Sequence, residues 1–238
     1  MAQDMTFENT TGPEKHQAIA MRYGTNQLVF YRCSFNGYQD TFYAKRQSQF
    51  YRDSEIYYFR QRCSCAPKLQ HIRGKTYEKS SECGEGLQSR EQSDQSTGIV
   101  IHNCHVTAAE DLRHVQHSFR TYLGWSLWVY PRTVIMKSTL NGLVDPTGRM
   151  LCNGSVGLST LYYGEYMNFG GCADTCGRVK LLGYHVIRST PDAKKFIVRN
   201  FISGDSWISR IGVPFQQWFR VTKISFVVQK LYTYAIEL

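Results

Sequence analysis

A six-residue pattern recurs along this chain: an apolar residue, any residue, a polar residue, Cys or Ser, any residue, and a second apolar residue. Its four copies are Phe30–Phe35, Tyr51–Ile56, Ile101–Val106 and Ile135–Leu140. Their first positions lie 21, 50 and 34 residues apart, which fits coils of about 20 to 25 residues with one longer loop. Short strands at such a period predict a solenoid, in which each coil buries its apolar face against its neighbours. A β-sandwich has similar strand spacing and is the alternative.

The aromatic content also favours strands, because the 238 residues include 16 Tyr and 13 Phe but only 6 Pro. This length is sufficient for one sizeable domain. Helical signals are weak, and the clearest is a short stretch over residues 108–115. No apolar run reaches the roughly 18 residues needed to cross a bilayer, which excludes a membrane-spanning helix. Residues 1–10 contain no apolar signal-peptide region, so the chain taken literally is expected not to be secreted.

The net charge of +9 suits a polyanionic partner, which would be nucleic acid, an anionic membrane or an acidic polysaccharide. The basic residues are scattered, so a solvated basic surface without a specific partner is an equal alternative. The eight cysteines include the close pairs Cys63/Cys65 and Cys172/Cys176. Neither pair has the repeat or the nearby histidines of a zinc site, so we expect free thiols and no metal.

Three stretches resemble signature motifs of the plant pectinesterases. They are residues 12–20 (G-P-E-K-H-Q-A-I-A), residues 37–43 (G-Y-Q-D-T-F-Y) and residues 158–168 (L-S-T-L-Y-Y-G-E-Y-M-N). Shorter matches at residues 177–180, 183–187 and 200–207 extend the resemblance from about residue 5 to Phe215. The resemblance implies an all-β, right-handed parallel β-helix (a solenoid) that lacks its N-terminal coils.

The resemblance further implies a carboxylic ester hydrolase of the cell wall that converts methylated homogalacturonan (pectin) to pectate and methanol without a cofactor. Its implied partners are pectin and proteinaceous pectinesterase inhibitors, with no nucleic acid and no membrane, and the chain is expected to be a monomer. The family is secreted to the cell wall, in contrast to the missing signal peptide of this chain. Pectin would also account for the basic charge, because it becomes a polyanion as its methyl esters are removed.

The motif matches assign catalytic roles to three residues. Asp40 matches the aspartate that protonates the leaving methanol and then takes a proton from water. Gln39 and Gln17 match the amides that donate hydrogen bonds to the tetrahedral oxyanion. Without the resemblance, Asp40 would be read as a turn residue that caps local backbone groups. The glutamines would likewise be read as polar residues that satisfy strand edges.

The family's nucleophile has no counterpart in this chain. Its aspartate belongs to D-F-I-F-G-N, and the matching residues 57–62 read Y-Y-F-R-Q-R. The family's L-G-R-P-W arginine is also missing, since residues 123–127 read L-G-W-S-L. The nearest carboxylates, Asp53 and Glu55, belong to the preceding strand, and recruiting either would need a change of register. We therefore expect this chain to be catalytically inactive.

The extent of the motif matches predicts a partial pectinesterase β-helix over residues 1–215 and a tail outside the family over residues 216–238. Residues 58–86 match nothing in a β-helix, and we hypothesise that they are translated out of frame. The tail is either a packed extra strand or a segment with no evolved role, and the second is favoured. Three functions stay open: a working esterase, a non-catalytic pectin-binding solenoid, and an unstable product of a faulty gene model.

Overall fold

The computed structural model describes residues 1–12, 15, 18–23, 25–38, 41–44, 46–57, 98–108, 113, 122–123, 130–142, 144–149, 157–215 and 225–230. The strands before residue 58 are β1 (Ala2–Gln3), β2 (Thr6–Glu8), β3 (Met21–Tyr23), β4 (Leu28–Tyr31), β5 (Ser34–Asn36), β6 (Phe42–Ala44), β7 (Arg46–Arg52) and β8 (Glu55–Tyr57). Those after residue 97 are β9 (Ile99–His102), β10 (His105–Val106), β11 (Arg132–Met136), β12 (Thr139–Leu140), β13 (Tyr162–Tyr166), β14 (Tyr184–Val186) and β15 (Ser225–Lys230). The helices near the carboxyl end are α3 (Thr190–Lys194), α4 (Val198–Phe201) and the 3-10 turns η4 (Gly204–Ser206) and η5 (Ser209–Ile211).

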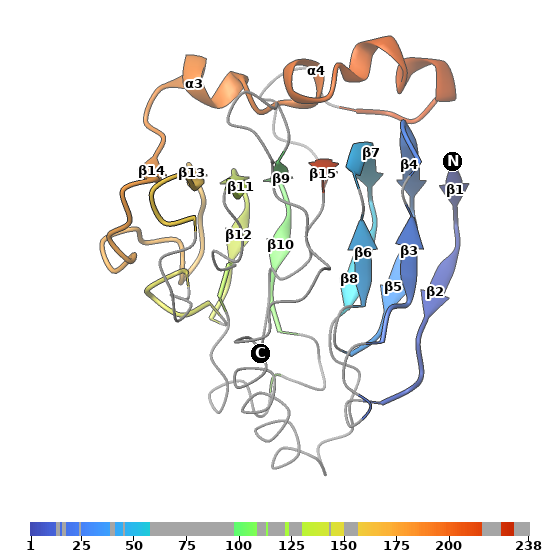
Figure 1. Cartoon of the computed structure of the whole chain (residues 1–238), viewed down its shortest axis with the longest axis horizontal. Helices are drawn as coiled ribbons and strands as arrows, with labels where there is room; N and C mark the ends of the chain where they lie inside the picture. The colour runs from blue at the N-terminus through green and yellow to red at the C-terminus, as the bar shows by residue number, and fades with distance from the viewer. Residues whose placement is uncertain are drawn as a thin grey trace.

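The strands stack as coils of a parallel β-helix. The largest sheet has the order β1-β4-β7-β15-β9-β11-β13-β14, and smaller sheets contain β2-β5-β8, β10-β12 and β3-β6. In Figure 1 the coils follow one another across the molecule from the N-terminal strands to β14. Successive coils pair in parallel, as β4 does with β7 and β11 with β13. This pairing confirms the predicted solenoid over the sandwich, whose sheets are antiparallel.

The six-residue pattern is the corner between two strands of one coil. Its polar third position has a left-handed backbone in every copy, with φ of 51° at Arg32, 50° at Asp53, 56° at Asn103 and 48° at Lys137. Left-handed residues turn the chain sharply, and exposed polar residues tolerate this conformation better than β-branched ones. The repeat therefore encodes a bend at the same place in each coil.

The Cys or Ser position links neighbouring coils through the corner. The buried Ser54 hydroxyl accepts a hydrogen bond from the Cys33 backbone N–H at 3.2 Å and donates to the Arg52 carbonyl at 3.1 Å. The buried Ser138 hydroxyl repeats this arrangement, accepting from the Cys104 N–H at 3.1 Å. Buried backbone groups at a bend need such partners, and a small hydroxyl side chain supplies them.

Two apolar layers lie on the two faces of the large sheet. Inside the solenoid, Phe30 stacks on Tyr51 with ring centroids 5.5 Å apart, and Ile101 and Ile135 continue the same column. On the other face, the column through Val29, Phe50, Val100 and Val134 packs in one cluster with the helical segment that contains α3 and α4. Both faces are therefore buried, which explains why β9 and β11 read as continuous apolar runs.

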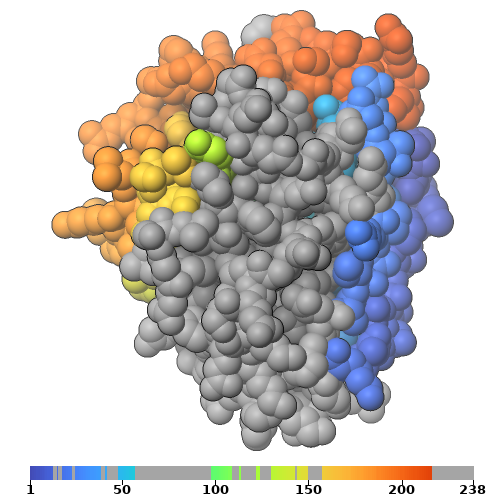
Figure 2. Space-filling view, viewed as in Figure 1, coloured from blue at the N-terminus to red at the C-terminus, as the bar shows by residue number. Residues whose placement is uncertain are grey.

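The helices α3 and α4 were not predicted from the sequence. Ser189 caps α3 by accepting a hydrogen bond from the Asp192 N–H, and a proline occupies the first turn. Both helices are too short to show a 3.6-residue pattern, so the sequence did not predict them. Their buried residues are identified only by their packing with the large sheet. Figures 1 and 2 show this helical segment along the top of the molecule, where it runs over successive strands of the large sheet. The helix expected over residues 108–115 lies mostly outside the described residues.

The tail contributes one strand. β15 runs antiparallel to both of its neighbours, β7 and β9, and sits between them in the large sheet (Figure 1). Of the two alternatives for the tail, a paired strand is therefore what the structure shows for residues 225–230. Among the described residues, no helix has the length and apolar character to span a membrane.

Candidate functional site

The three predicted catalytic residues, Gln17, Gln39 and Asp40, lie outside the described residues, and their roles stay predictions. The residues beside them are described. The Thr41 carbonyl accepts hydrogen bonds from the N–H groups of Ala20 at 2.8 Å and Met21 at 3.2 Å. Immediately after these residues, β3 and β6 pair in parallel, with Met21 opposite Phe42. The two motif segments thus adjoin positions on neighbouring coils that touch each other.

The beginning of the G-Y-Q-D-T stretch is tightly packed. Thr41 is fully buried, and a Cβ added to Gly37 would lie 2.8 Å from the Thr41 hydroxyl. Such a separation is too short for real side-chain carbons, so only glycine fits at residue 37. The stretch is therefore anchored on both sides of Asp40, by Gly37 before it and by the backbone contacts of Thr41 after it.

The absent nucleophile falls at the edge of the described chain. Tyr57, the first residue of the Y-Y-F-R-Q-R stretch, ends β8 opposite Asn36, and residues 58–62 lie outside the described part. The second missing group, the family's arginine, corresponds to Trp125, which is also outside it. Leu123, at the start of that stretch, is buried and donates its N–H to the Gly148 carbonyl at 2.8 Å.

The carboxylates nearest to the missing nucleophile are placed elsewhere on the coil. Asp53 lies at the left-handed corner between β7 and β8, and its carboxylate is 3.3 Å from the Arg52 guanidinium. Glu55 is exposed on β8, whereas the next residue, Ile56, packs against the interior cluster. Asp40 itself lies outside the described residues, between β5 and β6 in the chain. The Asp53 and Glu55 carboxylates thus lie on the corner and strand that precede the stretch matching the family's nucleophile.

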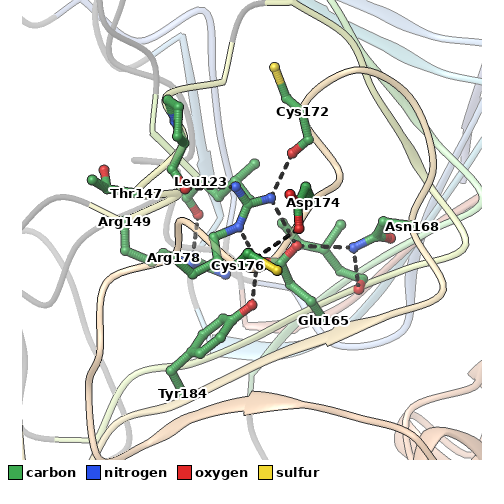
Figure 3. Close-up of polar contacts among 12 residues, drawn as sticks. Leu123, Thr147, Arg149, Glu165, Asn168, Cys172, Asp174, Cys176, Arg178 and Tyr184 are labelled. Atoms are coloured by element: carbon green, nitrogen blue, oxygen red, sulfur yellow. Dashed lines mark hydrogen bonds and ion pairs between the residues drawn. The ribbon is translucent and has the colours of Figure 1, made fainter.

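A buried ionic cluster on the last coils was not predicted. Glu165 occupies the column position opposite Ile135, where the other coils carry apolar residues. Its carboxylate binds the Arg178 guanidinium at 2.8 and 3.2 Å and accepts from the Tyr184 hydroxyl at 3.1 Å (Figure 3). The Glu165 and Arg178 side chains are 2% and 1% exposed. A carboxylate in an apolar column is the sequence signal that could have indicated this buried pair.

The surroundings of this cluster shift the pKa values of its members. Burial, followed by the neighbouring Glu165 carboxylate, raises the pKa of Tyr184. Burial alone would lower the pKa of Arg178, but its hydrogen bonds to Glu165 outweigh this and raise it. Arg178 also donates to the carbonyls of Cys172 at 2.7 Å and Pro146 at 3.0 Å. With its charges paired, the cluster connects the loops that contain Pro146 and Cys172 to strands β13 and β14, and we assign it a structural role.

A second buried arginine lies beside the stretch that lacks the family's arginine. Arg149 donates to the Leu123 carbonyl (Figure 3). It also lies over the Tyr163 ring, with its guanidinium carbon 4.2 Å from the ring centroid. Burial lowers its pKa. Arg149 is only 2% exposed, so it cannot reach a polysaccharide on the surface. It supports the Leu123 backbone and does not replace the missing group.

No metal centre emerges from the described part of the chain, in which no group of three or more His, Cys, Asp or Glu side chains is placed to hold an ion. Cys33, Cys104, Cys172 and Cys176 are free thiols. Cys33 and Cys104 are buried at coil corners, where their role is packing.

Known proteins resemble this chain in sequence. The family described as Pectinesterase matches residues 1–205. Pectinesterase 2 of Citrus sinensis is 45% identical over 226 residues, which cover 90% of this chain and 43% of that protein. Probable pectinesterase/pectinesterase inhibitor 41 of Arabidopsis thaliana is 42% identical, covering 90% of this chain and 38% of that protein. This chain thus spans less than half of the length of these curated relatives.

Solved structures agree with the fold. The pectin methylesterase from carrot has a TM-score of 0.74 at 35% identity, covering 90% of this chain and 69% of that chain. The pectin methylesterase from Aspergillus niger has a TM-score of 0.61 at 24% identity, covering 86% of this chain and 62% of that chain. The second likeness concerns the fold alone.

Proposed function

Because the chain belongs to the pectinesterase family, we propose that its ligand is pectin, that its reaction by descent is the hydrolysis of pectin methyl esters, and that this chain binds pectin without turning it over. The observation that carries the loss of turnover is the sequence between Glu55 and Glu78, which contains no carboxylate. The described positions of Asp53 and Glu55 support it, because Asp53 occupies the left-handed corner between β7 and β8 and Glu55 is exposed on β8, before the stretch that matches the family's nucleophile.

The chemistry explains why this loss matters. In the family reaction a carboxylate attacks the ester carbonyl, methanol leaves with a proton from the acid/base aspartate, and water then cleaves the acyl-enzyme. Asp40 would supply and retrieve the proton, and Gln17 and Gln39 would donate to the oxyanion. With the nucleophile gone, no acyl-enzyme forms. Removing a nucleophile lowers rates by on the order of 10³ to 10⁶.

Binding depends on different features. The net charge of +9 favours a polyanion, and partly de-esterified pectin carries free carboxylates. The coil stack supplies an extended surface, as solenoids commonly do for long ligands. We place this binding in the cell wall, with a monomeric chain and with proteinaceous pectinesterase inhibitors as further partners. Association with exposed charges weakens as salt screens them, so binding should fall as ionic strength rises.

The working esterase is the second candidate, because the stretch around Asp40 is intact and its anchors Gly37 and Thr41 are in place. The third candidate, an unstable product, is disfavoured by the two continuous apolar clusters on either face of the large sheet.

The test compares methanol release from highly methylated pectin by three purified proteins. The first is this chain, the second carries D-F-I-F-G-N at residues 57–62, and the third adds Asp40→Asn to the second. We expect no release from the first, release from the second and loss again in the third. Turnover by the unchanged chain would contradict the proposal and would make Asp53 or Glu55 the nucleophile.

Binding is measured separately, by retardation of the unchanged chain in gels containing de-esterified pectin at low and high salt. Retardation that disappears at high salt is expected. A folded chain that is not retarded by de-esterified pectin would contradict pectin binding. A chain that shows no cooperative unfolding transition would instead support the unstable product. Sequencing the transcript across residues 58–86 tests whether this stretch is read out of frame, and a transcript that encodes the printed residues without a shift or mis-splice would contradict that hypothesis.

A further inference from the structure

The chain contains two Asn-X-Ser/Thr triplets, which the proposed reaction does not use. Residues 9–11 (N-T-T) follow β2, and residues 153–155 (N-G-S) lie outside the described residues. In secreted proteins this triplet, with no proline at its middle position, is the acceptor for N-linked glycans. Three residues match easily, so the placement of Asn9 must show whether the folded chain has room for a glycan.

The side chain of Asn9 closes a local turn. Its amide oxygen accepts hydrogen bonds from the Thr11 backbone N–H at 2.9 Å and from the Thr11 hydroxyl. Asparagine side chains commonly form such turns with the residue two positions later. The hydroxyl that defines the triplet therefore lies against the amide that would be modified, through a contact that needs no distant part of the chain.

The amide nitrogen of Asn9 can take a glycan and keep its hydrogen bond. It donates to the Ile19 carbonyl at 3.2 Å, and an amide nitrogen carries two hydrogens. A glycan replaces one of them, which leaves the other for Ile19. The first sugar would then lie next to the stretch over residues 12–20, which contains Ile19.

The surroundings of Asn9 are open to solvent. Glu8, Thr10 and Thr11 are exposed, and Asn9 is half-buried. Figure 2 shows the N-terminal residues, in blue, on the surface along one side of the molecule. The backbone is fixed there, because the Asn9 N–H donates to the Asn36 carbonyl at 2.9 Å. A bulky hydrophilic group on this side chain would extend into solvent while the coils stay in place.

Asn168 is the opposite case. Its amide oxygen accepts a hydrogen bond from the Ser138 N–H at 3.1 Å, and its nitrogen donates to the Ile135 carbonyl at 3.1 Å. Both ends of that amide join neighbouring coils, so a glycan there would break the stack. Of the asparagines that the structure describes, only Asn9 begins an acceptor triplet.

We propose that Asn9 is a site of N-linked glycosylation. Its amide nitrogen bonds to the anomeric carbon of an oligosaccharide carried on a lipid pyrophosphate, the lipid pyrophosphate leaves, and the nitrogen loses one proton. This inference rests on the cell-wall placement in the proposed function, because chains meet the lipid-linked donor on entry into the secretory pathway.

The test translates the full chain, behind a cleavable secretory leader, in the presence of endoplasmic reticulum microsomes. Only chains protected from added protease are analysed, so every chain that is counted has entered the lumen. All proteins carry Asn153→Gln, which removes the second triplet. We expect a glycosylated product that an N-glycan-specific amidase returns to the mobility of the unmodified chain. Mass spectrometry of the treated product should locate the new carboxylate at residue 9.

Four substitutions in the triplet identify the modification. Asn9→Gln and Thr11→Val should abolish the mobility shift, and the second does so while keeping the asparagine and the size of residue 11. Thr11→Ser keeps the hydroxyl and Thr10→Ala changes the unrestricted position, so both should keep the shift. Protected chains without a glycan, or a shift that persists in Thr11→Val, would overturn the inference.

Urea unfolding tests whether the glycan lies in solvent. The glycosylated chain and the same chain after enzymatic removal of the glycan should unfold at the same urea concentration. A clearly lower midpoint for the glycosylated chain would overturn the surface placement of the glycan. Neither measurement uses pectin, so a failed glycosylation leaves the methanol-release and retardation results untouched, and a chain that does not bind pectin can still carry the glycan.

Discussion

The stack of β9, β11 and β13 and the junction of β7, β15 and β9 look alike in register but differ in origin. In the stack, Ile101 aligns with Ile135 and then with Glu165, and in the junction β15 aligns with both β7 and β9. In the stack, the strands follow one another in the chain and run in parallel, whereas the middle strand of the junction comes from the tail and runs the other way. The comparison teaches that buried faces fix which residues align, while connectivity fixes strand direction.

The stack ends in the buried Glu165–Arg178 pair, and breaking it should give the largest effect. Glu165→Ala leaves Arg178 buried without its partner, which should lower the free energy of unfolding by about 3–5 kcal/mol. Urea denaturation measures the loss. Asp192→Asn is the control, because Asp192 pairs with Lys195 on the exposed surface and such pairs contribute roughly 0–1 kcal/mol. Similar losses for the two variants would show that the stack does not depend on its buried charges.

The junction should be sensitive to acid through His102, which is paired in β9 with Met136 on one side and with Ser225 of β15 on the other. Burial, and next the charge of Lys137, lower the pKa of His102 to about 4. In the unfolded chain the pKa of His102 has its ordinary value near 6.5, so between pH 6.5 and 4 the unfolded chain binds a proton at this residue and the folded chain does not. Stability attributable to His102 is therefore complete above about pH 6.5 and falls as the pH drops toward 4, by up to about 3 kcal/mol.

Thermal unfolding of the unchanged chain and of His102→Gln between pH 7 and pH 4 checks this. The variant should lose less stability over that window, and His185→Gln, on the exposed side of β14, should follow the unchanged chain. If the thermal stability of all three proteins falls equally between pH 7 and pH 4, His102 is not the cause of the acid sensitivity. Hydrogen exchange of residues 99–102 in the same series would show whether the junction opens before the stack.

The corner hydroxyls compare the two regions directly. Ser138 lies within the stack and Ser54 beside the junction, and each accepts the N–H of a buried cysteine in the preceding coil. Replacing either by Ala leaves that N–H unpaired, at a cost of about 1–3 kcal/mol. Equal losses of unfolding free energy in urea denaturation would mean that neither region relaxes around the unpaired N–H more than the other. A clearly smaller loss for Ser54→Ala would mean that the junction relaxes around the missing bond.

Much of the coil geometry was contained in local sequence. The polar third position and the Cys or Ser after it predicted a repeated element, and the structure shows a left-handed corner with a buried hydroxyl or thiol at each copy. The solenoid and the family were also evident, because the motifs over residues 12–20, 37–43 and 158–168 are contiguous. The proposed loss of the nucleophile also rests on sequence alone, because the stretch from residue 56 to residue 77 contains no carboxylate.

Two further features could not be predicted from the sequence, because they depend on residues that come into contact only in the folded chain. The partner of Glu165 is 13 residues away in sequence, at Arg178, and only the turn of the last coils brings the two side chains together. The helices α3 and α4 are too short to show a period of their own, and the sheet beneath them selects their buried residues.

The sequence by itself thus determined the coil, its corner and the family, since each depends on residues that are neighbours in the chain. Only the tertiary structure decided that β15 lies between β7 and β9, because this pairing joins residues that are far apart in the sequence. The direction of β15 and its pairing partners depend on contacts between residues distant in sequence, which no local sequence pattern specifies.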